Sequence, residues 1–244
     1  MTQRYVSDEL THFVGQHDDR PDQQYERLIK ILKSGSLLAG GTRGPFGNAF
    51  ELRTHPDSDD PNSIFVPSVV CFCDIPVADL GIHIDKFSSF GLAFERNFLV
   101  GKGASPILYV AKNALTEYGV WGWKEQDTSD GRQQHFVLAI KKFLQLKNDE
   151  FMEAVKSDDL REELSLEIHH VLQFFETYVL SNIKFFDDQL ATADPNNYYM
   201  EREWRVPVSV EFTLPDVTRI IMPEGYARRF RDDLPDYYSS LHLV

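Results

Sequence analysis

The stretch 63–74 constrains the fold more than any other part of the chain. It is made largely of apolar, β-branched and aromatic residues, in the order Ser-Ile-Phe-Val-Pro-Ser-Val-Val-Cys-Phe-Cys-Asp. Such a run between turn-forming residues predicts a buried strand. Shorter apolar runs at 10–14, 90–94, 107–110, 201–211 and 217–223 predict further strands. A chain with this many strands must build its core around a sheet.

Helical periodicity appears in two regions. In residues 23–34, Leu28, Ile31 and Leu32 are spaced as on one helix face, with Asp22 as the expected N-cap and Gly35 as the C-terminal glycine. From residue 135 to about 186 the pattern is helical again. We therefore expect an α+β fold, with 1–244 as a single domain and 135–190 as a helical insertion within it.

Charge and composition exclude several classes of protein. The formal net charge of −13 argues against broad binding to nucleic acid through a basic face. It leaves open a nucleic-acid target held in a local basic groove, which the charge does not support, and it is compatible with a basic partner protein. No run of about 18 apolar residues exists, and the first residues lack the apolar core of a signal peptide, so we expect a cytoplasmic protein without membrane spans. Cys71 and Cys73 alternate on a strand, which predicts neither a disulfide nor a metal site.

The stretch 197–207 concentrates charge in an otherwise apolar context. It contains Asn-Tyr-Tyr-Met-Glu-Arg-Glu-Trp-Arg-Val-Pro and follows a helix-breaking segment at 194–197. A strand that begins near Met200 would place Glu201, Glu203 and Arg205 on one face. These residues could form a site in which a carboxylate meets a sugar hydroxyl. The alternative is a solvated ladder of cross-strand salt bridges.

Two histidines are candidates for ligand contacts. His12 lies near the end of the first strand, where a lone histidine is more often structural, and His83 follows a turn. The adjacent pair His169 and His170 point to different sides of a helix and are expected to be structural. The chain has no G-x-S-x-G, Walker, H-E-x-x-H or strand-linked G-x-G-x-x-G motif, so those enzyme classes are not supported.

Four segments together resemble the AbiGi family of abortive-infection (phage-resistance) antitoxins. They are Tyr-Val-Ser-Asp-Glu-Leu-Thr-His-Phe-Val-Gly at 5–15, Cys-Phe-Cys-Asp-Ile-Pro at 71–76, Phe-Gly-Leu-Ala-Phe at 90–94 and Tyr-Tyr-Met-Glu-Arg-Glu-Trp-Arg at 198–205. The resemblance runs over nearly the whole chain. It implies a role in antiphage defence and a cognate toxin, or another defence protein, as partner.

A looser resemblance is to the DNA-modifying ADP-ribosyltransferase toxins. It rests on a Thr-His strand, a helix that ends Ile-Leu-Lys-Ser-Gly, and the later Glu-x-Glu-Trp-Arg segment. This resemblance implies a split two-sheet β core with an NAD cleft.

Carried over by position, the ADP-ribosyltransferase resemblance also implies roles for individual residues. Glu203, or Glu201, would be the catalytic acid. The residues that would bind NAD are Thr11, His12, Phe72, His83, Tyr199 and Arg205. The central strand has Cys and Phe where a tyrosine partner would be expected.

Two functions stay open from the sequence. The first is an enzyme that transfers ADP-ribose or hydrolyses NAD, which requires His12 and Glu203 to face one pocket. The second is a non-catalytic antitoxin that neutralises a partner toxin by binding, which does not require this convergence.

Overall fold

The computed structural model describes residues 7–16, 18, 20–39, 52–55, 58, 60–111, 170–191 and 194–244. The chain forms two compact units, one of residues 1–50, 68–107 and 192–244, the other of 51–67 and 108–191. Strands and a few helices alternate in an α+β arrangement. The expectation of one domain over 1–244 stays a prediction, and most of the expected insertion at 135–190 lies outside the described residues. No helix in the described part of the chain is long and apolar enough to cross a membrane.

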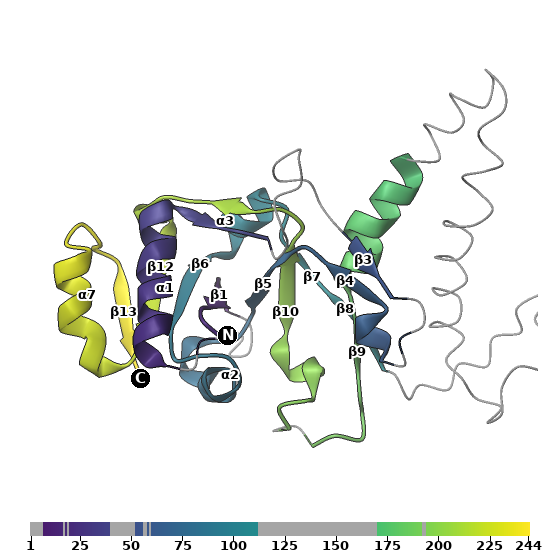
Figure 1. Ribbon diagram of the computed structural model, residues 1–244, viewed down its shortest axis with the longest axis horizontal. Helices are drawn as coiled ribbons and strands as arrows, with labels where there is room; N and C mark the ends of the chain where they lie inside the picture. Colours follow the sequence, from purple (N-terminus) through teal and green to yellow (C-terminus); the bar gives the residue numbers. More distant parts are fainter. Residues whose placement is uncertain are drawn as a thin grey trace, which may run out of the picture. The chain divides into compact units, whose positions relative to one another are not determined.

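A seven-stranded sheet organises the larger unit, in the order β13-β12-β6-β1-β5-β10-β7 (Figure 1). Only β12 and β13 pair in parallel; the other neighbours are antiparallel. A two-stranded sheet in the same unit pairs β2 (Ser36–Leu37) with β11 (Val210–Glu211). The strands of the large sheet are β1 (Glu9–Phe13), β5 (Val70–Cys73), β6 (Gly91–Glu95), β7 (Ser105–Pro106), β10 (Glu203–Val206), β12 (Val217–Met222) and β13 (Ser240–Leu243).

Helices cover both faces of this sheet. The α1 face carries Leu10, Phe72 and Val206, which share the main core with α1 (Pro21–Ser34). The opposite face, here called the α2 face, carries Cys73, which forms a smaller cluster with Leu80 and Ile221 next to α2 (Gly81–Lys86). The other short helices of this unit are α3 (Arg96–Gly101), α7 (Ala227–Asp233), η2 (Val77–Asp79), η6 (Tyr198–Glu201), η7 (Leu214–Asp216) and η8 (Glu224–Tyr226).

The helix α1 has a start and an end that its sequence explains in part. Pro21 occupies the first turn, where its missing N–H is not needed, and the N-cap is Arg20, which makes no side-chain cap bond. The expected cap by Asp22 is therefore wrong; its carboxylate instead accepts a bond from the Tyr226 hydroxyl at 2.9 Å. Gly35 ends the helix in the left-handed conformation, as predicted.

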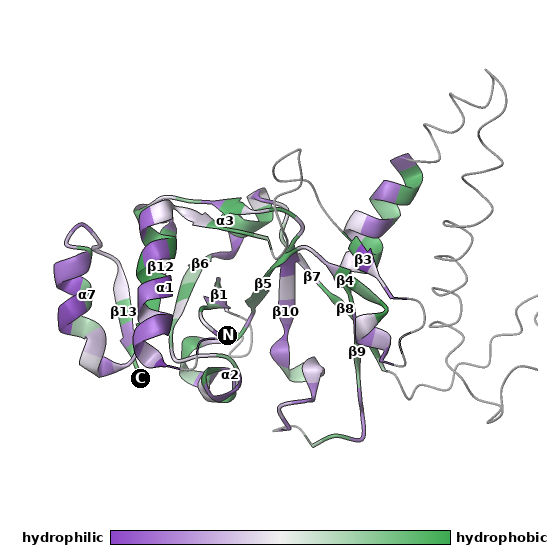
Figure 2. Ribbon diagram, viewed as in Figure 1, coloured by the Kyte–Doolittle hydropathy of each residue, from purple (hydrophilic) through white to green (hydrophobic). Residues whose placement is uncertain are grey.

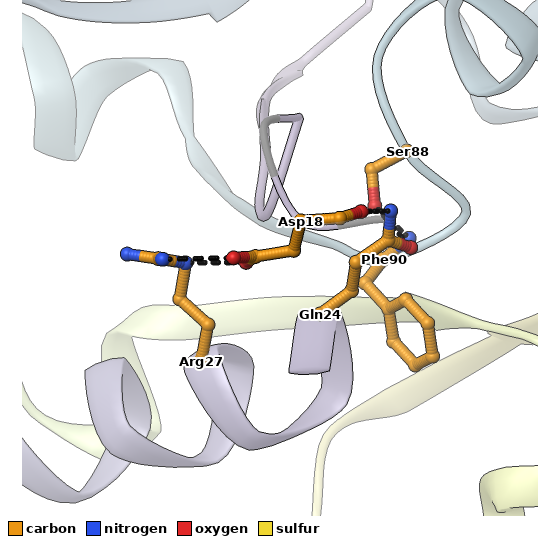
Figure 3. Close-up of polar contacts among 5 residues, drawn as sticks. All are labelled: Asp18, Gln24, Arg27, Ser88 and Phe90. Atoms are coloured by element: carbon orange, nitrogen blue, oxygen red, sulfur yellow. Dashed lines mark hydrogen bonds and ion pairs between the residues drawn. The ribbon is translucent and has the colours of Figure 1, made fainter. Parts of the chain in front are cut away.

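A polar network fixes the start of α1 against the loop that follows β1 (Figure 3). The Gln24 side-chain amide donates to the Asp18 backbone carbonyl and accepts from the Ser88 hydroxyl, and that hydroxyl in turn accepts from the Phe90 backbone N–H. Arg27 holds the Asp18 carboxylate through two bonds, at 2.6 and 3.0 Å. The Gln24 amide therefore connects the start of α1 and the loop before it to the distant segment that contains Ser88.

The described residues of the smaller unit contain two strand pairs. β3 (Leu52–Thr54) pairs antiparallel with β4 (Phe65–Pro67), and β8 (Leu108–Ala111) pairs in parallel with β9 (Ile183–Phe186). The Asn62 side chain donates to the carbonyl of Phe185 and accepts from its N–H. The 3-10 and π-helical turns here are η1 (Pro61–Ser63), η4 (Phe175–Val179) and η5 (Leu180–Asn182), and the core is Ile64, Phe65, Leu180, Ile183 and Phe185.

Several strand and helix predictions need correction. The single strand expected over 63–74 is two strands, β4 and β5, in different sheets, because the chain breaks at Pro67-Ser68. A proline cannot donate a ladder bond, so it ends β4. The strand expected over 201–211 is also two strands, β10 and β11, and residues 183–186, expected to be helical, form β9. The sequence did not predict α3 and β13. The helix expected around 226–234 is present as α7, which is coloured mostly hydrophilic in Figure 2 and has Phe230 as its buried residue.

We predict that Gly35→Ala destabilises the larger unit by about 1–2 kcal/mol, the usual penalty for an L-residue in the left-handed region. Gly35 has a φ of +63°, and an added Cβ would lie 2.7 Å from the Phe212 carbonyl oxygen. Urea denaturation measures the loss. Gly225→Ala is the control, since its Cβ would meet nothing within 4 Å; equal effects of the two substitutions would contradict this account.

Candidate functional site

Three residues from distant parts of the chain form one row on the α2 face. Thr11 of β1 pairs with Cys73 of β5, and Cys73 pairs with Glu203 of β10. Directly opposed residues project from the same face of a sheet, so all three side chains point to the α2 side. All three are buried. Burial raises the pKa of the Cys73 thiol to about 12, which makes it unreactive at neutral pH.

The sheet is weakly joined at this row. β1 pairs with β6 along its whole length, whereas its pairing with β5 is restricted to Thr11 and Cys73. Side chains connect the two strands on either side of that position. The His12 ring lies 2.8 Å from the Cys71 carbonyl, and Asp74 accepts a bond from the Ser7 backbone N–H at 2.8 Å.

Glu203 and Arg205 share one face of β10, as predicted. The guanidinium of Arg205 donates to the Glu203 carboxylate at 2.7 Å, with a second contact at 3.4 Å. Both side chains are buried. Because a buried carboxylate needs a compensating charge, the Arg205 guanidinium offsets the cost of burying the Glu203 carboxylate.

Glu201 is not part of this strand, contrary to prediction. The strand begins at Glu203, after the η6 turn and a left-handed Arg202 with φ 45° and ψ 50°. This residue breaks the alternation that the expected strand required. Glu201 instead meets Lys86 of α2, whose ammonium lies 2.7 Å from its carboxylate and 4.7 Å from the centre of the Tyr198 ring.

His12 lies on the α1 face, away from Glu203. It is the neighbour of Thr11 in β1, so its side chain projects oppositely, and its ring lies 5.7 Å from that of Phe72. A carbonyl oxygen only accepts, so Nδ1 donates to Cys71. Burial lowers the pKa of His12, and the bond to Cys71 partly opposes this. The expectation that His12 and Glu203 face one pocket is therefore wrong.

His83 is the imidazole that the fold places on the α2 face. It lies in α2, 4% exposed, with its ring 6.2 Å from that of Phe13 and nearly parallel to it. Neither ring nitrogen makes a hydrogen bond of ordinary geometry in the described part of the chain, but the Glu201 backbone lies close enough to act on the ring as a weak hydrogen-bond partner. Burial lowers the pKa of His83, while the backbone and the charge of Glu201 act in the opposite direction.

A narrow pocket opens beside His83. Its enclosed volume is about 10 Å³, which has room for about one water molecule. The lining is a ring of apolar and charged side chains from α2 and from the segment that precedes β10. These residues are Ile82, His83, Lys86, Asp194, Pro195, Asn197, Met200 and Glu201.

Two of the aromatic candidates lie apart from this pocket. Phe72 is buried in the main core, edge-on to Phe94 with ring centres 6.1 Å apart. Tyr199 is 55% exposed on η6. The fold thus brings together His83 and Glu201 at the pocket, and Thr11, Glu203 and Arg205 on the same side of the sheet, but neither His12 nor Phe72.

Sequence reasoning missed Lys86 and the role of Asp74. The Asp74 carboxylate lies 3.6 Å from the guanidinium groups of both Arg96 and Arg202. Its backbone N–H donates to the Arg202 carbonyl, which fixes the residue that precedes Glu203. The position of Asp74 directly after the strongest predicted strand could have indicated its role. Lys86 lies at the end of a short helix, and no pattern near it in the sequence indicates that it pairs with Glu201.

The arrangement holds opposite charges in fixed positions and places a buried imidazole, that of His83, next to a small pocket. No group of three or more His, Cys, Asp or Glu in the described residues could hold a metal ion. The carboxylates of Glu201 and Glu203 are paired with the side chains of Lys86 and Arg205, respectively.

We predict that Lys86→Met lowers the free energy of unfolding by about 3 kcal/mol, because it leaves the Glu201 carboxylate buried without its cation. The double variant Lys86→Met/Glu201→Met should lose less than Lys86→Met alone, since no charge stays buried. Glu26→Gln is the control: its contact with Arg229 at 3.9 Å is exposed, and the loss should stay below about 0.5 kcal/mol. Additive losses in the double variant would contradict this.

We predict that acid destabilises the protein partly through His83. Its folded-state pKa lies below that of a free imidazole, so below about pH 6.5 the unfolded chain binds a proton that the folded state resists. Stability should therefore fall from pH 7 to pH 5. His83→Phe, which keeps the contact with Phe13, should flatten this decline in chemical denaturation series. Identical pH profiles for both proteins would refute it.

The comparisons with known proteins identify one family. Searches of curated proteins and of solved structures find no match. A family model described as "Putative abortive phage resistance protein AbiGi, antitoxin" matches residues 65–233, which is more than half of the chain and includes α2, the pocket and β10. The segment that contains β1 and His12 precedes the match. The chain therefore belongs to the AbiGi family of abortive phage resistance proteins.

Proposed function

We propose that this chain is the antitoxin of a two-component abortive-infection system and that it restrains a cognate toxin by binding, without catalysis. The observation that carries the proposal is the separation of the candidate catalytic groups. His12 projects from the α1 face and Glu203 from the α2 face. A catalytic acid and its supporting imidazole would need one common pocket.

The state of the two acids supports a binding role. Glu203 is held by Arg205 and Glu201 by Lys86, each at 2.7 Å. A carboxylate that already has a cation is less available to stabilise positive charge on a substrate. These pairs fix the geometry around η6 and β10, which suits a rigid recognition surface.

The net charge of −13 supports a basic partner. Opposite net charges accelerate the encounter of two proteins and disfavour acidic competitors. The toxin is therefore expected to present a basic surface, and the complex should weaken as salt rises.

We predict that expression of the chain rescues cells from the toxin encoded by the neighbouring gene, and that the purified pair forms a complex. Glu203→Gln/Arg205→Gln removes the charges of the buried pair together; if it folds, as judged by its thermal unfolding, it should rescue as well as the wild type. Failure of the wild-type chain to rescue or to bind would refute the proposal.

A second candidate is an ADP-ribosyltransferase-like cleft that binds NAD, within a split two-sheet β core. The weak joint between β1 and β5 favours it, since strands that pair at one position leave backbone groups available for a ligand. Glu203 stands beside that joint with Thr11. Cleavage of the N-glycosidic bond builds positive charge on the ribose, which a nearby carboxylate would stabilise. Arg205 would meet the pyrophosphate.

Incubation with NAD separates the two candidates. The antitoxin proposal expects no nicotinamide release by the wild-type chain. Release that falls by about 100-fold or more in Glu203→Gln, in line with the loss of an electrostatic catalytic group, would replace it with the second candidate. The thermal unfolding of Glu203→Gln must match that of the wild type for this conclusion to hold.

A further inference from the structure

We propose that β13 is the edge at which two copies of this chain pair, so that their seven-stranded sheets join into one. β13 is the last strand in the order of the large sheet (Figure 1). It pairs with β12 on one side, and no strand in the described part of the chain pairs with it on the other. This pairing is independent of the antitoxin role.

The hydrogen bonds at the end of β13 show which backbone groups face outward. The Val244 N–H donates to the Met222 carbonyl, and the Val244 carbonyl accepts from the Glu224 N–H. Because backbone groups alternate in direction along a strand, every second residue before Val244 also faces β12. Leu241 and Leu243 therefore present their N–H and C=O groups to the open edge. Outside the ladder with β12, neither backbone makes a hydrogen bond in the described part of the chain.

β13 lacks the residues that usually prevent a sheet edge from pairing. Charged side chains and proline commonly block such an edge in natural proteins. The opposite edge of the same sheet, β7, is two residues long and contains Pro106. Residues 237–244 contain no Asp, Glu, Lys or Arg, although charged residues make up 26% of the chain. One edge of the sheet is therefore protected, whereas the other can accept a strand.

Exposed apolar side chains gather at the same edge. Tyr238, Leu243 and Val244 are three of the twelve large apolar side chains that are exposed among the described residues, and they lie within seven consecutive positions. Such a concentration marks an interaction surface. Leu241 packs against the main core, and Leu243 projects from the same face of β13 but is 43% exposed. A strand added at this edge would cover Leu243 and extend the core.

A second copy of β13 is the strand that fits this edge. In an antiparallel pairing with the two-fold axis at His242, Leu241 of each copy exchanges backbone bonds with Leu243 of the other. All outward-facing groups are then satisfied, and Leu243 of one copy lies beside Leu241 of the other on one face of the joined sheet.

Charge also favours a second copy over a basic partner at this edge. Each copy has a net charge of −13, so two copies repel each other over most of their surfaces. A strand without charged residues lets them meet without placing like charges in direct contact. A basic partner would find no acidic side chain on this strand to recognise.

The first experiment measures the oligomeric state of the full chain by sedimentation velocity over a range of concentrations. The wild type should dimerise with a Kd on the order of 10 µM, since a short edge buries little surface. Leu243→Lys puts a charge on the edge and should weaken the dimer by about ten-fold or more. Val100→Lys is the control, because Val100 is similarly exposed, at 49%, but lies on α3.

Two results of this experiment would overturn the inference. One is a wild type that stays monomeric at about 100 µM, well above the expected Kd. The other is a dimer that Leu243→Lys weakens no more than Val100→Lys does.

Cysteine cross-linking tests the register and leaves the edge uncharged. In the two-fold pairing, the Cα atoms of the two His242 residues lie about 4.5 Å apart, within disulfide range. Oxidation should therefore link His242→Cys chains into covalent dimers, in a Cys71→Ser background that removes the exposed native thiol. Ser240→Cys is the matched control, since its two copies would lie about 14 Å apart. Failure of His242→Cys to link, or equal linking of Ser240→Cys, would contradict the pairing.

Toxin binding separates this inference from the proposed function. If the chain dimerises through β13 but restrains no toxin, the pairing stands and the antitoxin role fails. If the wild type is a monomer and Leu243→Lys abolishes toxin binding, the edge takes a strand of the toxin and the pairing of two copies is wrong.

Discussion

The joint between β1 and β5 is the constraint on which the larger unit depends. It brings together the two halves of the seven-stranded sheet, yet the two strands pair only at Thr11 and Cys73. The imidazole of His12 and the carboxylate of Asp74 complete the joint through side-chain bonds to backbone groups. These side-chain bonds take the place of ladder hydrogen bonds. The Cys71 carbonyl and the Ser7 N–H are therefore both engaged in holding β1 to β5. His12 therefore has a structural task that competes with any role as a ligand contact.

Ion pairs organise the α2 side of the sheet. Lys86 with Glu201 connects α2 to the η6 turn, and Arg205 with Glu203 lies within β10. Buried pairs of this kind add little net stability, because desolvation offsets their attraction, but they penalise any arrangement that separates the charges. The Lys86–Glu201 pair consequently fixes α2 against η6, whereas the Arg205–Glu203 pair fixes two side chains along β10.

Local sequence patterns predicted where strands and helices occur better than they predicted where individual side chains lie. The first strand, α1 with its terminal Gly35, β6, β12 and α7 all follow from apolar spacing and from caps or turns close in sequence. The place of Glu201 in the η6 turn, outside β10, could not be predicted, since a single left-handed residue at Arg202 interrupts the strand. That conformation is held by contacts of Asp74, which is distant in sequence, with both the backbone and the side chain of Arg202. The pairing of Lys86 with Glu201 spans a similar distance and leaves no local pattern.

The sequence by itself determined an α+β chain with acidic net charge, the family to which it belongs, and the sharing of one strand face by Glu203 and Arg205. These properties depend on residue types and on spacings of a few positions, which act through local sterics and hydrophobicity. Only the tertiary structure decided which histidine accompanies the acids. The register of β1 against β5 turns His12 to the α1 face, and the packing of α2 brings His83 to the other. Strand register and helix docking depend on contacts between distant segments, and a shift of one residue would exchange the two faces.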